Sequence, residues 1–394
     1  MLGPGSIFNL EGDELLARRK LLLPPFSGKN MRAYESITEE EAIREIRTWP
    51  EGTEFATLEP MMRITLNTIL RAVFGAEGAE LDELRVLMPK AVEFGSKIAL
   101  MPSIVRKDVG PWSPGGKFAQ YRRRMDELLK SLMAQARSDP KFTERGDVLS
   151  LLLQARYDNG EPISDSYIVD ELLTMLVAGH ETTSTQLAWT IERIRRHPDL
   201  LTRLTEEVDA GGNELLLATI AESQRTRPVL TAALRRTKAR IRLGGEWVIP
   251  EGDTILASTQ LAMAAEQSFP RCGKKVQPGP IRRQPAESLR VDSVRRGGMM
   301  RCIGASFATM EMEVTLRAML REFRLEPTTE PDEKPHSRGV TVTPRGADVS
   351  SCTAARMSCP PVTPTRCRWP TAPVRRGQKR YCSIRAFRAM AGNR

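Results

Sequence analysis

The spacing of hydrophobic and polar residues predicts a chain that is mostly helical. Apolar and charged residues alternate with a helical period through most of the sequence, and turn signals such as Pro24-Pro25 separate the runs. The longest run starts at the capping side chain of Ser164 and reaches Arg196, where His197-Pro198 interrupts it. We therefore expect a mainly α fold with small β elements packed on it. Helices are predicted at 12–22, 38–48, 58–75, 80–94, 116–137, 147–156, 164–196 and 305–323, and short strands at 239–249, 254–258 and 339–344.

Two segments show neither a helical nor a strand period. Residues 271–300 are rich in Arg, Gly, Pro and Ser, and residues 347–394 contain five prolines and four cysteines. Such a composition buries too little apolar surface to offset the entropy cost of ordering the chain. The sequence therefore predicts one domain over 1–346, atypical and irregular at 271–300, followed by a basic, disordered tail at 347–394.

The net charge is concentrated in the same two segments. The chain of 394 residues carries a formal charge of +10, which by itself suggests an anionic partner. Residues 271–300 contribute +6 and residues 347–394 contribute +9, so the remaining chain has a net charge of −5. A basic nucleic-acid-binding protein stays as an alternative, but the tail lacks the interleaved aromatic residues or recognition helix that it would use. We expect no nucleic-acid partner.

The cysteines and histidines restrict the compartment and the metal chemistry. All six cysteines lie at position 272 or later, a pattern unlike a secreted disulfide scaffold, so we expect a reducing, cytoplasmic location. The three histidines are scattered singly, which argues against a histidine-based metal site. The longest apolar stretch, Leu172 to Ile191, contains Glu181, His180 and several hydroxyl residues. It is a poor membrane span and a good buried helix, and we expect a monomer without a membrane partner.

The centre of the long predicted helix contains residues that a buried helix disfavours. Ala178-Gly179-His180-Glu181-Thr182 is followed by Thr183-Ser184-Thr185, so a glycine, an acid and four hydroxyl residues stand where Leu and Ala are preferred. The Thr182 hydroxyl can bond back to the Ala178 carbonyl, and Gly179 would let a small ligand approach the backbone. The alternative is a threonine-rich packing face with Glu181 extending to solvent.

Cys302 is the second candidate. It follows Gly297-Gly298, precedes Ile303-Gly304, and stands just before a strongly amphipathic helix. A helix N-terminus favours the thiolate, which is the form that ligates metals. The flanking glycines, Gly298 and Gly304, would let a large flat ligand lie close to the backbone. The alternative for a single cysteine is a buried apolar side chain.

Glu222 and Arg225 lie three residues apart on one helical face, which alone indicates only a surface ion pair. In combination and in this order, the three features resemble the cytochrome P-450 family of haem-thiolate monooxygenases, soluble bacterial type. Ala178-Gly179-x-Glu181-Thr182-Thr183 is similar to the oxygen-activating motif, Glu222-x-x-Arg225 to the pair that supports the haem side of the fold, and Cys302-Ile303-Gly304 to the haem-thiolate loop. The likeness covers about residues 3–270 and 301–346.

The resemblance implies a fold, a cofactor and a role for each residue. Cys302 would be the axial ligand of haem b (heme b, iron protoporphyrin IX), and Arg19 would bind a propionate. Thr182 would hydrogen-bond dioxygen, the co-substrate, and Glu181 would help to deliver protons. Ala178, Gly179, Gly298 and Gly304 would lie against the cofactor. The implied reaction inserts one oxygen atom into an apolar small molecule, with electrons from a ferredoxin-type donor and its reductase.

The sequence also departs from the family pattern. The family has a further stretch before Gly12, so the resemblance implies that the N-terminal part of the fold is missing. Leu15 stands where the family has Trp or His, Arg295 where it has Phe, and Met300 where it has a propionate-binding Arg or His. Met300 removes a charge-assisted bond. We therefore expect this polypeptide to bind haem poorly or not at all, and the alternative function is a non-catalytic, haem-deficient remnant of the fold.

The abrupt stop and restart of family-like sequence suggests a cause for these departures. We hypothesise that 271–300 and 347–394 are out-of-frame translation of GC-rich DNA, since both segments are rich in Arg, Pro, Ser and Cys. Resequencing the gene and translating the other frames tests this hypothesis. The absence of a haem-loop motif in those frames would refute it.

Overall fold

The computed structural model describes residues 2–28, 30–50, 55–75, 77–99, 101–265 and 301–345, together with the backbone of 354–356. Predictions made for 271–300 and for most of 347–394 lie outside the described residues, and so do those made for Gly298, Arg295 and Met300. Contacts within the chain group Met1–Met357 into one compact unit.

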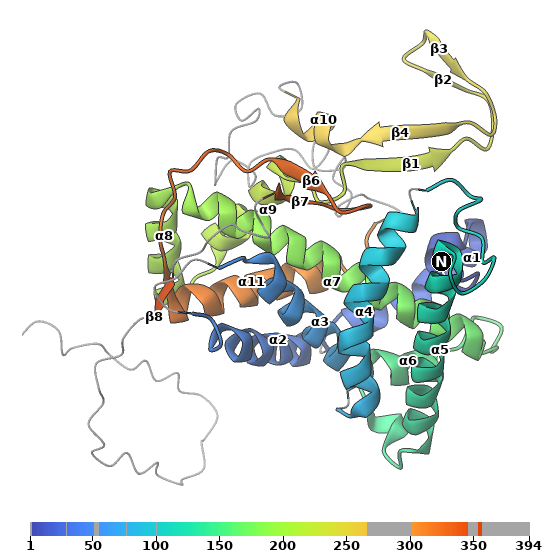
Figure 1. Cartoon of the computed structure of the whole chain (residues 1–394). Coiled ribbons are helices and arrows are strands. Elements are labelled where there is room, and N and C mark those ends of the chain that lie inside the picture. Colours follow the sequence, from blue (N-terminus) through green and yellow to red (C-terminus); the bar gives the residue numbers. More distant parts are fainter. Residues whose placement is uncertain are drawn as a thin grey trace, which may run out of the picture. The chain divides into compact units, whose positions relative to one another are not determined.

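Most of the described chain is helical, as the sequence pattern predicted (Figure 1). The strands form two-stranded antiparallel sheets that pair β1 with β4, β2 with β3, β5 with β8 and β6 with β7. The helices are α1 (Gly12–Leu22), α2 (Asn30–Ile46), α3 (Leu58–Phe74), α4 (Ala79–Ala99), α5 (Pro114–Ser138), α6 (Val148–Gln154), α7 (Asp165–Arg195), α8 (Pro198–Asp209), α9 (Glu214–Thr226), α10 (Thr259–Ala264) and α11 (Ala305–Glu322). The strands are β1 (Ala232–Arg236), β2 (Ile241–Leu243), β3 (Trp247–Ile249), β4 (Thr254–Ser258), β5 (Phe323–Leu325), β6 (Pro335–Ser337), β7 (Val342–Pro344) and β8 (Ala354–Arg356).

Local signals explain where several helices begin and end. The Asp147 carboxylate accepts a hydrogen bond from the Ser150 amide at 2.9 Å and so caps α6. Gly75 ends α3 with a φ of 57°, a left-handed conformation that glycine adopts without strain. The long helix α7 ends at Arg195, just before His197-Pro198 as the sequence predicted, and Pro198 becomes the first residue of α8, a position that favours proline.

The long helix α7 passes through the core of the unit and contacts α3, α4, α5, α6, α8, α9, α11 and β7. Apolar side chains gather on both sides of it in two large clusters. One joins α3, α4, α5 and α6 to the first half of α7, and the other joins α2, α8, α9 and α11 to its second half. None of the helices in the described part of the chain is long and apolar enough to cross a lipid bilayer.

Two strand predictions need correction. The strand expected at 339–344 begins only at Val342, because Arg338 to Thr341 form the turn in which the Arg338 amide donates to the Thr341 carbonyl at 2.9 Å. The segment expected to be irregular from 347 onward contains β8, whose backbone pairs with β5. Backbone pairing of three residues needs no apolar pattern, so a composition argument cannot predict it.

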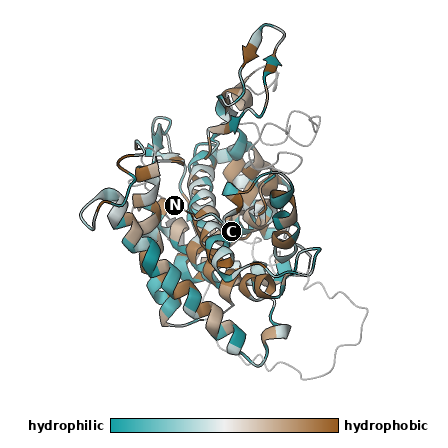
Figure 2. Cartoon of the chain, turned by 90° about the vertical axis from the view of Figure 1, so that its right-hand side faces the viewer, coloured by the Kyte–Doolittle hydropathy of each residue, from teal (hydrophilic) through white to brown (hydrophobic). Residues whose placement is uncertain are grey.

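The hairpin of β2 and β3 projects from the helices (Figure 2), and five of its six strand residues are exposed. Trp247 is 70% exposed and Leu243, its cross-strand partner, is 55% exposed. The sheet of β1 and β4 continues this surface, since the paired residues Leu234 and Leu256 are each 62% exposed. The described residues therefore leave an apolar face on this side of the fold uncovered.

Candidate functional site

The middle of α7 contains the partly buried and hydroxyl-bearing residues that the sequence indicated. The Thr182 hydroxyl donates to the Ala178 carbonyl at 2.7 Å, the back-bond expected from the sequence. Met175, Ala178, Gly179 and Thr182 are only partly buried, and their spacing of three and four residues puts them on one side of the helix. Thr183, Ser184 and Thr185 are buried, so the packing interpretation holds for these three residues alone.

Gly179 permits close helix packing. A Cβ at this position would meet side-chain atoms of Ile69 at 3.3 Å, so α3 and α7 approach each other where α7 lacks a side chain. We expected this glycine to admit a ligand to the backbone. The structure shows that at least part of the freed space is taken by Ile69 of the neighbouring helix.

Glu181 is buried and held at one oxygen. Its side chain is 6% exposed, and the Thr341 hydroxyl donates to its Oε1 at 2.9 Å. Burial raises the pKa of Glu181, while the hydrogen bond from Thr341 and the charge of Arg338 act against that rise. The raised pKa makes the protonated form of this carboxyl group more populated than it is for a carboxyl group in water. The interpretation in which Glu181 extends to solvent is wrong.

His180 was not identified from the sequence, yet it is one of the most buried polar side chains of the site. It is 1% exposed, and neither ring nitrogen has a hydrogen-bond partner of normal geometry among the described residues. Burial lowers the pKa of His180 to about 4, so its ring is neutral at pH 7. Its carbonyl accepts a hydrogen bond from the Thr65 hydroxyl at 3.0 Å, which ties α3 to the opened part of α7.

Cys302 lies in the loop three residues before the first residue of α11. Its side chain is exposed and forms no disulfide, so the interpretation as a buried apolar side chain is wrong. The next residue, Ile303, packs against the same apolar cluster as Met175 of α7. The thiol-bearing loop and the partly open side of α7 therefore border one core cluster.

Arg19 lies close enough to Cys302 for their charges to interact. Partial burial lowers the pKa of Arg19, and a charged Cys302 thiolate acts against that effect. The adjacent residue, Arg18, has a structural role. Its side chain is 1% exposed, and it pairs with Glu171 at 2.8 Å while the rings of Tyr157 and Tyr167 lie against the guanidinium group. Of two consecutive arginines on α1, only Arg19 is left partly exposed beside the cysteine.

Glu222 and Arg225 form a buried ion pair. Arg225 donates to both Glu222 carboxylate oxygens, at 2.7 and 2.8 Å, and also to the Met263 carbonyl at 2.8 Å. The Glu222 side chain is fully buried and that of Arg225 is 3% exposed, so the sequence-based interpretation as a surface pair is wrong. The pair joins α9 to α10, and a two-bond contact of this kind fixes geometry as well as charge.

The chemistry of the described residues fits a haem. They contain no group of three or more His, Cys, Asp or Glu side chains that could hold a metal ion. A haem carries its own nitrogen ligands, so a single protein thiolate would hold it, and the exposed Cys302 thiol would supply that bond. Arg19 supplies a cation next to that thiol, and Ala178 presents only a small side chain on the partly open side of α7.

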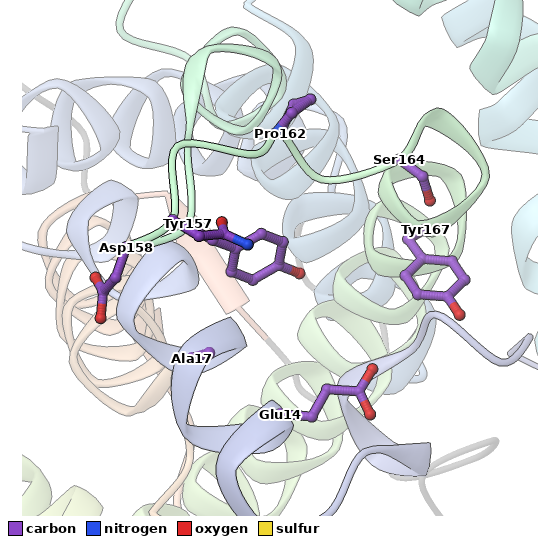
Figure 3. A pocket seen from close by; sticks show the side chains of 8 residues that line it. Glu14, Ala17, Tyr157, Asp158, Pro162, Ser164 and Tyr167 are labelled. Carbon is purple, nitrogen blue, oxygen red and sulfur yellow. The ribbon is translucent and has the colours of Figure 1, made fainter.

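A hollow of about 580 Å³ lies away from the predicted site residues, between α1 and the segment leading into α7 (Figure 3). Tyr157 and Tyr167 line it together with Glu14, Ala17 and Asp158. The same two tyrosines enclose Arg18, so this hollow borders a structural ion pair. None of the residues predicted for the site lines it.

Comparison with known proteins gives the chain a family context. The family model described as Cytochrome P-450 matches residues 3–274 and 297–350. Proteins named cytochrome P-450 138, from Mycobacterium tuberculosis (strain ATCC 25618 / H37Rv) and Mycobacterium bovis (strain ATCC BAA-935 / AF2122/97), are 48% identical over 345 residues, which are 88% of this chain and 78% of each relative. Cytochrome P-450 135B1 of the same M. tuberculosis strain is 32% identical over 391 residues, covering 91% of this chain and 79% of that protein.

Solved structures share the fold. The heme domain of cytochrome P-450DA is similar with a TM-score of 0.75 and 21% identity, covering 91% of this chain and 81% of that one. A retinoic acid-bound cyanobacterial CYP120A1 is similar with a TM-score of 0.78 and 19% identity, covering 90% and 82%. The mainly α fold predicted from the sequence is confirmed.

Proposed function

This chain belongs to the cytochrome P-450 family, and we propose that Cys302 is the thiolate through which it acts as a haem monooxygenase. One observation carries the proposal: an exposed thiol stands before α11 and interacts electrostatically with the partly buried Arg19. When bound through a thiolate, a haem b supplies dioxygen activation and the transfer of one oxygen atom. The residues of this chain determine how the cofactor, the substrate and the protons are placed.

Cys302 and Arg19 hold the cofactor in this proposal. The free amides at the start of α11 and the nearby guanidinium group both favour the charged form of the thiol. Arg19 is free to pair with a propionate because Arg18, and not Arg19, is used in the buried pair with Glu171. Gly304 would let the macrocycle lie close to the backbone, since a Cβ there would meet nothing within 4 Å.

Glu181 and Thr182 handle protons in this proposal. Thr182 places a hydroxyl on the partly open side of α7, where it can pass a proton and orient dioxygen. Glu181 is its neighbour in sequence, and its raised pKa suits it to donate a proton and take it up again. We further propose an apolar small-molecule substrate, with electrons from a ferredoxin-type protein and its reductase.

A haem titration of the purified full chain, followed by absorbance, tests the proposal. We expect a saturable, thiolate-type spectrum in the original chain, with weak affinity because Met300 stands where the family has a cationic residue. Cys302→Ala is expected to lose that spectrum, and the matched control Cys272→Ala to keep it. Equal spectra for the original chain and Cys302→Ala would refute the proposal and favour the haem-deficient remnant.

A further inference from the structure

The hairpin of β2 and β3 presents an apolar side to the solvent. Ile241 pairs with Ile249 across the two strands, and Leu243 pairs with Trp247. Cross-strand partners share a face and alternate residues point to opposite faces, so these four side chains lie on one side of the hairpin. Trp247, Leu243 and Ile241 are 70%, 55% and 38% exposed. An exposed apolar patch of this kind marks a contact site for a protein or a membrane.

The shape of the hairpin favours a deformable partner. It projects away from the helices (Figure 2), and Gly244 and Gly245 close it in a tight turn with φ values of 61° and 81°. Neighbouring strands lie only about 5 Å apart, so a ribbon of two strands is narrow and convex. A lipid surface can adjust around such a ribbon, whereas two convex ribbons from separate copies of the chain would touch over a small area.

The charge around the apolar side is positive. Residues 232–258, from β1 to β4, contain five cations and three acids. Arg240 and Arg242 are exposed beside the apolar pairs, whereas Glu251 and Asp253 lie between β3 and β4. A long arginine side chain can reach past the edge of a narrow ribbon and keep its charge at a lipid headgroup. The hairpin thus combines apolar area with cations, which suits an anionic lipid surface and disfavours a second copy of the same charge.

The turn carries an acid, and this determines how the hairpin can approach. Glu246 follows Gly245 at the tip, so a tip-first approach would bring a carboxylate against anionic headgroups. An approach on the apolar side keeps Glu246 at the margin and places Trp247 and Leu243 at the boundary between headgroups and hydrocarbon. Tryptophan is enriched at that boundary because its ring is apolar and its N–H group is polar. The apolar side is therefore the surface that docks.

We propose that the hairpin of β2 and β3 docks the protein on an anionic lipid surface through its apolar side. The sequence predicted no membrane partner because no stretch of it suits a membrane span, and the helices of the described residues agree with that reason. A hairpin that lies on the surface spans nothing, so the reason does not apply to it. The proposal replaces that prediction and does not depend on haem binding.

Quenching of tryptophan fluorescence by brominated lipids tests this proposal on the full chain without added haem. Vesicles of phosphatidylcholine mixed with brominated phosphatidylglycerol supply the anionic surface, and brominated phosphatidylcholine alone is the neutral comparison. We expect the anionic vesicles to quench the original chain more strongly than the neutral ones. Trp247→Phe should lose that quenching, and Trp112→Phe should keep it, because Trp112 is a 76% exposed residue between α4 and α5. Equal quenching in the two variants would overturn the proposal.

Sedimentation with the same vesicles measures the contribution of the apolar side. Leu243→Ser combined with Trp247→Ser should weaken binding about tenfold at high salt, where the attraction of cations elsewhere in the chain is screened. Val109→Ser combined with Trp112→Ser is the matched control and should leave binding unchanged, because both side chains are exposed in the loop between α4 and α5. Circular dichroism verifies that both variants fold. Equal binding by the two variants would overturn the role of the hairpin.

The cations of the hairpin are tested separately at low salt. Arg240→Gln combined with Arg242→Gln should weaken binding to the anionic vesicles several-fold. Lys130→Gln combined with Arg203→Gln removes the same charge from exposed positions of α5 and α8 and should change binding less. Equal losses would show attraction by net charge alone and would overturn docking by the hairpin. Self-association that depends on Trp247 and occurs without vesicle binding would identify a second copy as the occupant and would also overturn the lipid proposal.

Discussion

Burial of His180 makes the stability of the fold sensitive to acid. The ring is 1% exposed, and its pKa falls to about 4 from an ordinary value of 6.5. The unfolded chain therefore binds a proton at this residue below pH 6.5, while the folded chain stays neutral there until about pH 4. The stabilising contribution is complete above pH 6.5 and is lost as the pH falls through this window. The difference of 2.5 units corresponds to about 3 kcal/mol.

Urea unfolding followed by circular dichroism measures this contribution. Between pH 7 and pH 5, the original chain should lose about 2 kcal/mol of unfolding free energy relative to His180→Leu. The comparison isolates His180, because carboxyl groups with raised pKa values, such as Glu181, change stability in the opposite direction in both proteins. His336→Gln is the matched control, since that side chain on β6 is exposed. Parallel pH profiles for the original chain and His180→Leu would refute the reasoning.

Three further perturbations follow from the same contacts. Glu171→Gln leaves Arg18 buried without its carboxylate and is expected to lower the free energy of unfolding in urea by about 3–5 kcal/mol. The control Lys20→Met removes one partner of an exposed ion pair and should change that free energy little. Similar losses in both variants would contradict this account. Gly339→Ala puts a Cβ against Ser96 at a residue with positive φ, and it should lower the free energy of unfolding by about 1–3 kcal/mol, measured by thermal unfolding. Unchanged stability would show that the turn is not packed there. Met300→Arg restores a cation that the family uses and should tighten haem binding in an absorbance titration at least tenfold; unchanged affinity would show that another departure limits binding.

Much of the architecture follows from periodicity alone. The long helix predicted at 164–196 is α7 at Asp165–Arg195, and the predicted strand 254–258 coincides with β4. Helix α2 begins at Asn30, eight residues before the predicted start. Its first turns carry Met31, Tyr34 and Ile37 at helical spacing, and these side chains pack in the apolar cluster of α3 to α6, so the apolar period extends further than the predicted helix.

The site was predictable where it depends on local chemistry and unpredictable where it depends on tertiary contacts. The Thr182 back-bond to Ala178 spans four residues and could be read from the sequence. The hydrogen bond from Thr341 to Glu181 spans 160 residues, and no local signal marks Thr341. The choice between Arg18 and Arg19 likewise depends on Glu171, Tyr157 and Tyr167, which are distant in sequence.

The central claim is that Cys302 is a haem ligand, and a spectrum of the reduced, carbon-monoxide-treated chain tests it most directly. The purified full chain is mixed with haem, reduced and exposed to carbon monoxide. The account predicts the thiolate-type Soret band in the original chain and its absence in Cys302→Ala. A Soret band of the non-thiolate type, or an identical spectrum in both proteins, would contradict it.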